Sequence, residues 1–468
     1  MPSNDDLPPL CVDLDGTLIT TDSAFESMLQ VLRRRPWMLL ATPWWLRRGR
    51  AHLKRRLAEN GMADPALLPY HEPVVSFVRN EKAKGRRVIL ATGSDEMVAG
   101  PIAEHVGLFD EVIASDGHTN RTGSDKVEAI GARLGDGPYD YIGNSTTDLP
   151  IWADARDALV VLASERVRRR LEAIKTPSRV FPVDSNRPRD LWRSVRPSRW
   201  IRNLLLFVPL LPAYRAVEIA DWPPALVLIA GFIAFCACAS AGYLFNDLVD
   251  VEPDRRHATR KQRPLAAGRV QSPALVAIGI VLVLAGLALG GLVGGAFALT
   301  LLAYLLLSTL YSMIGRASAP LQAVLLGALA MARVLAGAIM VDVAPSGWLL
   351  GFWSLLLLSL ACAGIVGEAR QSRSTVRPAA VHAIGLAAAL ASVAVLVAHL
   401  VGAPAPGLPR PWLFWFLVPL LVLWLARTLQ RAMRGMLGGD PIVGSVRDPL
   451  SWAAAVAAAL ALALATGG

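Results

Sequence analysis

The sequence predicts two parts: an N-terminal α/β domain with a parallel sheet, and a C-terminal all-α region that crosses a membrane about nine times. Over roughly the first 195 residues, short apolar runs alternate with amphipathic stretches, as they do in parallel α/β folds. From about residue 203, apolar runs dominate, and several approach the ~20 residues that a helix needs to span a bilayer. We therefore expect one domain at residues 1–185 and a second at residues 186–468.

Polar residues stand at the ends of the predicted strands. The candidate strands are residues 10–15, 87–91, 139–142 and 159–162, separated by helical stretches such as 74–84 and 126–134. Asp13 and Asp15 end the first strand, Thr92 follows the second, and Asn144 follows the third. Ligands of parallel α/β sheets bind beyond the carboxyl ends of the strands, so we expect these side chains to meet there.

The residue types at this edge suit phosphoryl transfer. Asp13 and Asp15 are two apart and point the same way from one strand. One carboxylate can attack phosphorus, and the other can protonate the leaving alkoxide and later activate water. Thr92 can bind a phosphoryl oxygen, and Lys126 can neutralise developing charge. Two carboxylates beside a phosphate call for a cation with oxygen ligands, for which Mg²⁺ is suited.

The order DLDGT, ATGS, Lys126 and GNSTTD resembles the haloacid dehalogenase (HAD) phosphatase superfamily over about residues 8–165. The resemblance implies a Rossmann-like fold with a helical cap at about residues 20–70. It also implies Asp13 as nucleophile, Asp15 as acid and base, Thr92 as phosphate ligand and Lys126 as charge stabiliser. Asp13, Asp15, Asn144 and Asp148 would hold Mg²⁺. Asn144 replaces the usual aspartate, which removes one negative charge, and the alternative is a HAD domain with a structural role only.

The predicted cap is unusually basic and rich in tryptophan. Its sequence includes RRRPWMLLATPWWLRRGRAHLKRRL, and basic residues with tryptophans are typical of membrane interfaces. Two interpretations are open. In the first, the cap docks on a membrane and receives a lipid-linked phosphate. In the second, it is a solvated basic cap whose tryptophans pack internally.

Nine apolar runs are candidate transmembrane helices. They lie at about residues 203–213, 224–245, 274–291, 293–313, 319–341, 347–366, 380–402, 410–427 and 450–466. With the N-terminus inside, the predicted cytosolic loops carry nearly all of the loop arginines and lysines, as the positive-inside rule requires. The N-terminus lacks the pattern of a signal peptide. We expect a multi-pass protein of the cytoplasmic (inner) membrane with its first domain in the cytosol.

An acidic motif ends the second predicted span. Asn246, Asp247, Asp250 and Asp254 are spaced so that one helix would stack them on one face. Like charges so close together are costly unless a cation binds, and Mg²⁺ bridging a diphosphate is the natural occupant. Basic residues suited to phosphate oxygens follow the motif: Arg255, Arg256, Lys261 and Arg263.

The pattern NDxxDxxxDRxHxxxKxRPxAxG closely resembles the UbiA prenyltransferase superfamily, and the likeness covers about residues 190–466. Aromatic prenyltransferases of that superfamily carry a second Asp-rich motif, but the matching loop here, GIVGEARQSRSTVRP, has only Glu368 and is basic. The stretch RPSRWIRNLLLFVPLLPA and the segment MARVLAG are similar to the decaprenyl-phosphate phosphoribosyltransferase branch. That branch implies a substrate-binding set that adds Arg196, Arg202, Asn203, Tyr311 and Arg333 to the basic residues above.

The resemblance implies transfer of phosphoribose from phosphoribosyl diphosphate to polyprenyl phosphate with Mg²⁺. The HAD domain would then dephosphorylate the 5-phosphoribosyl lipid, which would feed cell-envelope glycan synthesis. The alternative is a UbiA-type aromatic prenyltransferase, of the quinone or haem type, with a regulatory or unrelated HAD domain. The net charge of +10 fits phosphorylated partners and lipid headgroups. Because the chain has no zinc spacing and no recognition-helix motif, nucleic acid is not an expected partner, whereas homo-oligomers stay open. All four cysteines stand in apolar contexts and are predicted to be reduced.

Overall fold

The chain forms two compact units, one of which contains a segment from the membrane region. The computed structural model describes residues 7–135, 137–161, 164–183, 187–209, 225–315, 317–371, 379–402, 409–437, 441–446 and 448–466. Unit 1 comprises Met1–Ser194 together with Asp247–Ala277, and unit 2 comprises Val195–Asn246 and Ile278–Gly468. We call Asp247–Ala277 the acidic loop. The predicted two-domain division at residue 186 stays a prediction.

Unit 1 is built on a six-stranded parallel sheet in the order β3-β2-β1-β4-β5-β6. The strands are β1 (Leu10–Val12), β2 (Val88–Asp95), β3 (Glu111–Ser115), β4 (Asp140–Gly143), β5 (Asp157–Val161) and β6 (Arg179–Phe181). The α/β class predicted from sequence is therefore confirmed. The four strands predicted from sequence correspond to β1, β2, β4 and β5, whereas β3 and β6 were not predicted.

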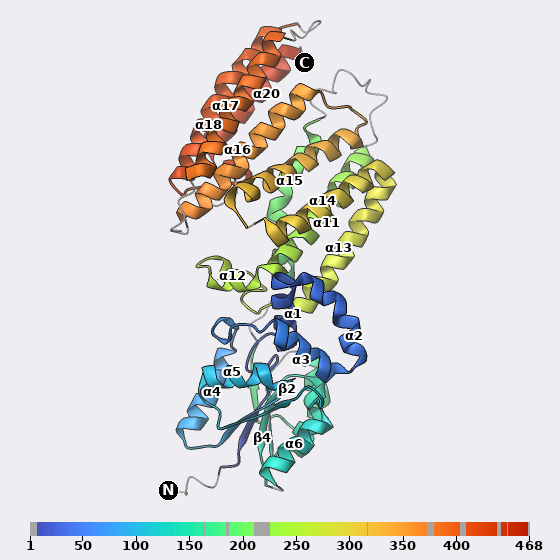
Figure 1. Cartoon of the computed structure of the whole chain (residues 1–468), viewed down its shortest axis with the longest axis vertical. Helices are drawn as coiled ribbons and strands as arrows, with labels where there is room; N and C mark the ends of the chain where they lie inside the picture. Colours follow the sequence, from blue (N-terminus) through green and yellow to red (C-terminus); the bar gives the residue numbers. More distant parts are fainter. Residues whose placement is uncertain are drawn as a thin grey trace. The chain divides into compact units, whose positions relative to one another are not determined.

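Helices cover both faces of this sheet (Figure 1). The helical elements are α1 (Ser23–Arg34), η2 (Pro36–Ala41), α2 (Thr42–Arg47), α3 (Arg50–Asn60), η3 (Pro65–Leu67), α4 (Glu72–Ala83), α5 (Glu96–Val106), α6 (Ser124–Leu134), η4 (Thr146–Asp148), α7 (Leu149–Asp154), α8 (Glu165–Glu172) and α9 (Arg187–Val195). The elements from α1 to η3 stand between β1 and α4, where the sequence predicted a cap. The acidic loop adds α12 (Val251–Arg256) and η7 (Arg260–Gln262).

The alternation of strand residues builds two cores. Successive strand residues point to opposite faces, so β1 sends Leu10 and Val12 to one core and Cys11 to the other. The first core lies under α4 and α5, and the second lies under α6, α7 and α8. Because both faces are covered, the strands are almost continuously apolar until they end in polar residues. The polar residues therefore gather at the carboxyl ends of the strands.

Unit 2 is all helical in the part that the structure describes. Its elements are η5 (Pro197–Phe207), α11 (Ala225–Val249), α13 (Ser272–Val293), α14 (Gly295–Ile314), α15 (Ala319–Met340), α16 (Gly347–Gln371), α17 (Ala379–Gly402), η8 (Pro411–Phe416), α18 (Leu417–Met433), α19 (Pro441–Val446) and α20 (Pro449–Thr466); α11 and α13 continue into the acidic loop. Helices α16, α17, α18 and α20 lie side by side (Figure 1). A Cβ atom at Gly337 of α15 would overlap the carbonyl oxygen of Leu206. The glycine therefore allows the backbones of η5 and α15 to pack directly against each other.

Seven helices among the described residues are long and apolar enough to cross a membrane, and Pro449–Ala465 is a shorter apolar helix. The chain is therefore a multi-pass membrane protein. The count of nine spans stays a prediction, because residues 210–213 of the first predicted span lie outside the described residues. The orientation also stays a prediction, since loop residues such as Arg316 and Arg373 lie outside them as well.

The acidic loop packs against the cap side of unit 1. Arg255 donates to both carboxylate oxygens of Glu26 in α1, at 2.7 and 2.9 Å, and both side chains are buried. Gly268 has a φ of +68°, and a Cβ atom there would overlap Thr20 Oγ1. Arg269 Nε donates to the buried carboxylate of Asp190 at 3.2 Å. A segment that lies between two membrane spans in sequence is thus part of the α/β unit.

Candidate active sites

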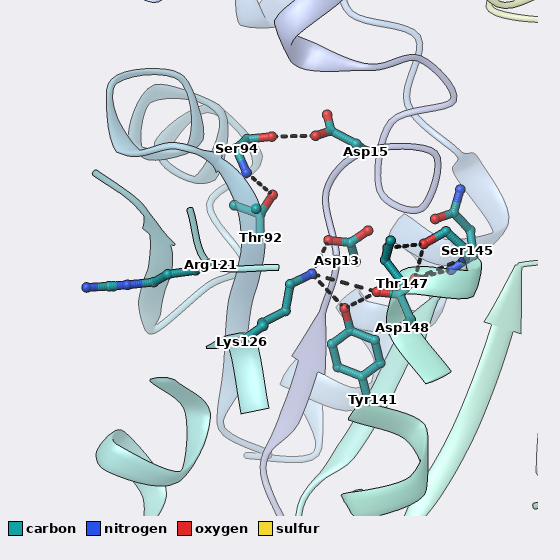
Figure 2. Close-up of polar contacts among 12 residues, drawn as sticks. Asp13, Asp15, Thr92, Ser94, Arg121, Lys126, Tyr141, Ser145, Thr147 and Asp148 are labelled. Carbon is teal, nitrogen blue, oxygen red and sulfur yellow. Dashed lines mark hydrogen bonds and ion pairs between the residues drawn. The ribbon is translucent and has the colours of Figure 1, made fainter. Parts of the chain in front are cut away.

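Asp13 and Lys126 form the centre of the first site. Asp13 directly follows β1, and Lys126 stands in the first turn of α6. Lys126 Nζ donates to Asp13 Oδ1 at 2.8 Å and to Tyr141 Oη at 2.9 Å, and lies 3.8 Å from Asp148 Oδ1 (Figure 2). All four side chains are buried. The predicted nucleophile and the predicted charge stabiliser are therefore in direct contact.

Burial and charge together set the protonation of this centre. Burial raises the pKa of Asp13 to about 7, because the lowering effect of Lys126 is outweighed. Burial alone would lower the pKa of Lys126, but the charges of Asp13 and Asp148 outweigh it and raise that pKa. Burial raises the pKa of Tyr141 well above its usual value. The site is thus poised so that a further cation would favour the ionised nucleophile.

Asp15 lies at the base of the cap, beside Ser94 (Figure 2). Its Oδ1 accepts the backbone N–H of Ser23, the first residue of α1, at 2.7 Å, and its Oδ2 accepts from Ser94 Oγ. The Ser94 N–H in turn donates to Thr92 Oγ1 at 3.0 Å. These hydrogen bonds hold the Asp15 carboxylate in one orientation.

Asp148 organises the loop that follows β4. Its Oδ2 accepts the N–H groups of Asn144 and Ser145, at 3.1 and 2.9 Å, and the Ser145 hydroxyl at 2.9 Å. Its Oδ1 accepts from Tyr141 Oη at 2.9 Å (Figure 2). Every one of these bonds orients the loop that carries Asn144. The geometry suits Asp148 better to positioning than to direct metal binding.

Several of the residues described above line one cavity of ≈ 330 Å³. It brings together the sequence-predicted residues Asp13, Asp15, Lys126, Asn144 and Asp148, and adds Lys54 from the cap and Gln271, Ser272 and Pro273 from the acidic loop. Among the described residues, no three His, Cys, Asp or Glu side chains form a metal-binding group. A cation here would therefore need the oxygen of Asn144 in addition to Asp13 and Asp15, a donor set that fits Mg²⁺.

Lys54 is a residue that the sequence did not single out for the site. Its Nζ donates to the carbonyl of Gly93 at 2.5 Å and to Asn120 Oδ1 at 3.1 Å. Burial lowers its pKa, although the charges of Asp15 and Asp22 oppose this. Lys54 therefore places a cap cation over the loop that carries Thr92. Its position within a run of basic residues gave no sequence signal to separate it from its neighbours.

The acidic loop holds the second set of carboxylates. Asp247, Asp250 and Asp254 are all buried. Arg263 Nη1 donates to Asp247 Oδ1 at 3.1 Å and to Asp254 Oδ2 at 2.5 Å. Burial raises the pKa of Asp254, and its Oδ1 is buried without a hydrogen-bond partner. This oxygen lies 3.9 Å from Arg260 Nη1 but accepts no hydrogen bond, so a bound cation would satisfy it.

The sequence predicted that one continuous helix would carry the acidic motif, and this prediction is wrong. Helix α11 ends at Val249, Asp250 has a φ of −97° and a ψ of 8°, and α12 begins at Val251. The Asp254 N–H still donates to the Asp250 carbonyl at 2.9 Å. The interruption coincides with the chain's exit from an apolar span, and it keeps one turn of spacing between the two carboxylates.

Three of the four basic residues predicted to bind phosphate pair with carboxylates of unit 1. Arg255 pairs with Glu26, Arg256 pairs with Glu252 and Asp64, and Arg263 pairs with Asp247 and Asp254. Lys261 has no side-chain ion pair within the described part of the chain. Arg255 Nε also donates to the Ala266 carbonyl at 3.0 Å. All three guanidinium nitrogens of Arg255 therefore donate to groups of the protein.

In unit 2, Arg333 is buried in α15 among polar and aromatic groups. It donates to Asn203 Oδ1 at 2.8 Å, to the Leu329 carbonyl at 2.5 Å and to Tyr304 Oη at 2.9 Å. Its guanidinium also lies over the rings of Phe235 and Tyr304. No acid pairs with it in the described part of the chain. A buried guanidinium with only neutral partners suits an anionic ligand.

The remaining predicted residues of unit 2 are dispersed over three elements. Arg196 lies over the ring of Tyr243, with its guanidinium carbon 5.7 Å from the centroid. Arg202 and Tyr311 are half-buried, and Asn246 accepts from Ser312 Oγ at 3.3 Å. Asn203 is buried and donates to Cys236 Sγ at 3.1 Å. Because Asn203 is occupied by Arg333 and Cys236, it is better placed to orient Arg333 than to contact a ligand.

Comparison with known proteins agrees with the two predicted folds. Residues 206–435 match the UbiA prenyltransferase family, and residues 10–152 match the haloacid dehalogenase-like hydrolases. Uncharacterized protein y4nM of Sinorhizobium fredii is 33% identical over 482 residues, which cover 97% of this chain and 91% of the relative. The chain belongs to the UbiA prenyltransferase family and carries a HAD-like domain. It is therefore a membrane enzyme with a transferase half and a hydrolase half.

Other relatives match one half. Decaprenyl-phosphate phosphoribosyltransferase of Mycolicibacterium smegmatis is 32% identical over 161 residues, which cover 34% of this chain and 51% of that protein. Among solved structures, a UbiA homolog from Archaeoglobus fulgidus bound to GPP and Mg²⁺ is 16% identical and covers 59% of this chain and 98% of that chain, with a TM-score of 0.44. Proteins of the UbiA and HAD families generally depend on Mg²⁺.

Proposed function

We propose that the UbiA half transfers phosphoribose from phosphoribosyl diphosphate to a polyprenyl phosphate, and that the HAD half removes the 5-phosphate of the product. The relatives named decaprenyl-phosphate phosphoribosyltransferase support the transfer. The observation that carries the combined function is the assembled Asp13–Lys126 site, whose cavity is lined in part by residues 271–273 of the acidic loop. The contact between Asp13 and Lys126, in a cavity that residues of the acidic loop also line, supports two consecutive reactions over a structural HAD domain.

In the proposed transfer, a phosphate oxygen of the lipid attacks the anomeric carbon of the donor, and diphosphate leaves. Asp247, Asp250 and Asp254 of the acidic loop, with Asn246, would hold Mg²⁺, which when bound neutralises diphosphate charge. Arg263 bridges Asp247 and Asp254 and is placed to contact diphosphate when the carboxylates bind the cation. Arg333, with Arg196 and Arg202, would bind the anionic lipid headgroup, and Lys261 would contact the donor.

In the proposed hydrolysis, Asp13 attacks the phosphorus of the 5-phosphate and forms an aspartyl-phosphate. Asp15 protonates the departing ribose oxygen and then takes a proton from the water that hydrolyses the intermediate. Thr92 and Lys126 bind the phosphoryl oxygens and stabilise charge in the transition state. The hydrogen bonds of Asp15 with Ser23 and Ser94 fix its direction for proton transfer. The product is a ribosyl lipid for cell-envelope glycan synthesis.

The proposal also assigns a compartment. Both substrates of the transfer carry phosphates, and phosphoribosyl diphosphate is a soluble, intracellular donor. We therefore place unit 1 in the cytosol and the spans in the cytoplasmic membrane, as the distribution of loop arginines in the sequence indicates.

The test is an assay of the full chain with radiolabelled phosphoribosyl diphosphate, polyprenyl phosphate and Mg²⁺. We expect label in the lipid fraction and release of inorganic phosphate from the lipid product. With Asp13→Asn, the phosphorylated lipid should accumulate at an unchanged rate of transfer. Transfer of a prenyl group to an aromatic acceptor, without label in lipid, would instead identify the chain as an aromatic prenyltransferase.

A further inference from the structure

One face of the cap carries large apolar side chains that remain exposed. The segment Pro36–Arg50 contains Trp37, Leu40, Trp44 and Leu46, whose exposed fractions are 65%, 84%, 57% and 51%. Exposed clusters of this kind on a soluble surface mark sites of interaction. We call these four residues, together with Arg47, Arg48 and Arg50, the cap face.

The fold of the segment does not depend on this face. Trp45, next to Trp44 in α2, is only 5% exposed and packs with Val31 and Leu57 in a small core of the cap. Successive helical residues point about 100° apart, so burying Trp45 turns Trp44 outward. The interpretation that all cap tryptophans pack internally is therefore correct for Trp45 and wrong for Trp37 and Trp44.

The cap face is positively charged as well as apolar. Arg47, Arg48 and Arg50 are exposed, and within the described residues none of them has an ion pair. Arg48 lies over the ring of Trp44, with its guanidinium carbon 5.6 Å from the centroid. Tryptophan beside arginine is the combination that lipid headgroups favour.

The cap is also tied to a stretch of chain that has just left an apolar span. Arg33 and Arg34, at the end of α1, lie 3.6 and 3.7 Å from Glu252. Glu252 follows Val249, the last residue of the candidate span Leu226–Val249, by three residues. Three residues reach at most about 11 Å along the chain, so the end of α1 is joined by its ion pairs to a residue close in sequence to the end of a candidate span.

We propose that the cap face binds the surface of an anionic bilayer, with Trp37, Leu40, Trp44 and Leu46 in the headgroup region and Arg47, Arg48 and Arg50 on anionic lipids. Charge decides between this occupant and a second copy of the chain, since two identical faces would bring two sets of arginines together. The contact holds the cap, and with it Lys54 over the hydrolase cavity, at the membrane. Its consequence is that anionic lipid content controls how the cap is placed.

The experiment uses the full chain with Leu40→Cys, labelled with an apolar, environment-sensitive fluorophore in place of Leu40. All four native cysteines are buried, so the label is selective. The protein is reconstituted in vesicles of phosphatidylcholine with or without phosphatidylglycerol, and brominated lipids serve as quenchers. We expect blue-shifted emission and strong quenching in the anionic vesicles. The same label at Ile174→Cys, an exposed apolar site on the α/β body, should emit as in water in both.

Two variants that each lose three arginines distinguish lipid binding by the cap face from a general effect of the protein's net charge. Arg47→Gln/Arg48→Gln/Arg50→Gln should lower the equilibrium constant for membrane contact by about 100-fold, since each arginine near an anionic surface contributes about five-fold. Arg166→Gln/Arg169→Gln/Arg170→Gln removes the same charge from α8 and should leave quenching unchanged.

Three results would overturn the proposal. One is emission at Leu40→Cys that matches Ile174→Cys in anionic vesicles. Another is quenching that is insensitive to loss of Arg47, Arg48 and Arg50. The third is a blue shift that brominated lipid does not quench and that grows with the protein-to-lipid ratio, which would show that a second copy covers the face.

Discussion

Asp13 and Asp254 are both buried carboxylates of unit 1, but they are paired with cations of different kinds. Asp13 accepts from Lys126, whose Nζ also contacts Tyr141 and faces a cavity of ≈ 330 Å³. Asp254 accepts a hydrogen bond from Arg263, which also donates to Asp247 and so links two parts of the acidic loop. The first site is open to a ligand with its catalytic groups already in contact, whereas the second is held closed by its own guanidinium. Under the proposed function, preorganisation would differ between the two reactions: the hydrolase centre is built in advance, whereas the acidic loop would exchange its contacts with Arg263 for substrate and metal.

The largest effect should follow from removing the hydrolase nucleophile. Asp13→Asn cannot form the aspartyl-phosphate, so phosphomonoester hydrolysis by the full chain should fall by about 10⁴-fold. Phosphate release from the labelled lipid measures it. Asp116→Asn is the control, because that carboxylate accepts turn amides of His118 and Thr119 and lies 3.8 Å from Arg121, and it does not line the cavity. Hydrolysis within ten-fold of the parent chain would mean that this centre is not the active one.

The next effect concerns the pair that joins the two sites. Glu26→Gln leaves the Arg255 guanidinium buried without a counter-charge and should lower the free energy of unfolding of unit 1 by about 3–5 kcal/mol. Denaturant titration of the full chain in detergent, read by hydrogen exchange of the β1 amides, measures this. Glu59→Gln breaks an exposed pair with Arg56 and should cost less than about 1 kcal/mol. Equal losses in the two variants would show that the loop is not anchored through Arg255.

Removing the charge of Asp254 in the acidic loop should separate the two reactions. Asp254→Asn should lower phosphoribosyl transfer by about 100-fold, because a weaker hold on the cation stabilises the leaving diphosphate less. Hydrolysis of a supplied phosphomonoester by the same protein is the internal control and should stay unchanged. If both rates fell together, the comparison between an independent hydrolase centre and a closed transferase loop would fail.

The smallest effect comes from restoring the charge missing after β4. Asn144→Asp adds a carboxylate to the cavity that Asp13 and Asp15 line, and should raise the affinity of the hydrolase site for Mg²⁺ by about ten-fold. The Mg²⁺ dependence of phosphate release checks it, with transfer as the unaffected reference. A constant Mg²⁺ requirement would indicate that residue 144 lies outside the coordination sphere.

Much of the first site could be predicted because its chemistry sits at strand ends. Strands β1 and β4 are short apolar runs followed by Asp13 and Asn144, and Thr92 follows the apolar first half of β2, so the apolar runs place these residues toward one edge of a sheet. Strands β3 and β6 were missed because both are short and partly exposed, which leaves no alternation to detect.

The contacts that could not be predicted all join distant parts of the chain. Ser23 and Ser94 reach Asp15 from the cap and from β2, and Lys54 reaches Gly93 from α3. Each of these residues has other polar or basic residues nearby in the sequence, so its type and spacing do not single it out. Likewise, nothing in the acidic motif indicates that Arg255 would choose Glu26, a residue more than two hundred positions earlier, over a phosphate. Such choices are made by burial, which sequence spacing does not record.

The placement of the acidic loop has a practical consequence for anyone dissecting this enzyme. A membrane half expressed alone from residue 186 would keep Arg255 and Gly268 but lose Glu26 and the Thr20 and Pro69 side chains that approach Gly268 closely. The Arg255 guanidinium would lose its counter-ion, and the carboxylates of the acidic loop would lose the contacts that support the loop. Fusion of the two domains in one chain therefore has a structural meaning: the α/β domain supports a segment that lies between two membrane spans in sequence.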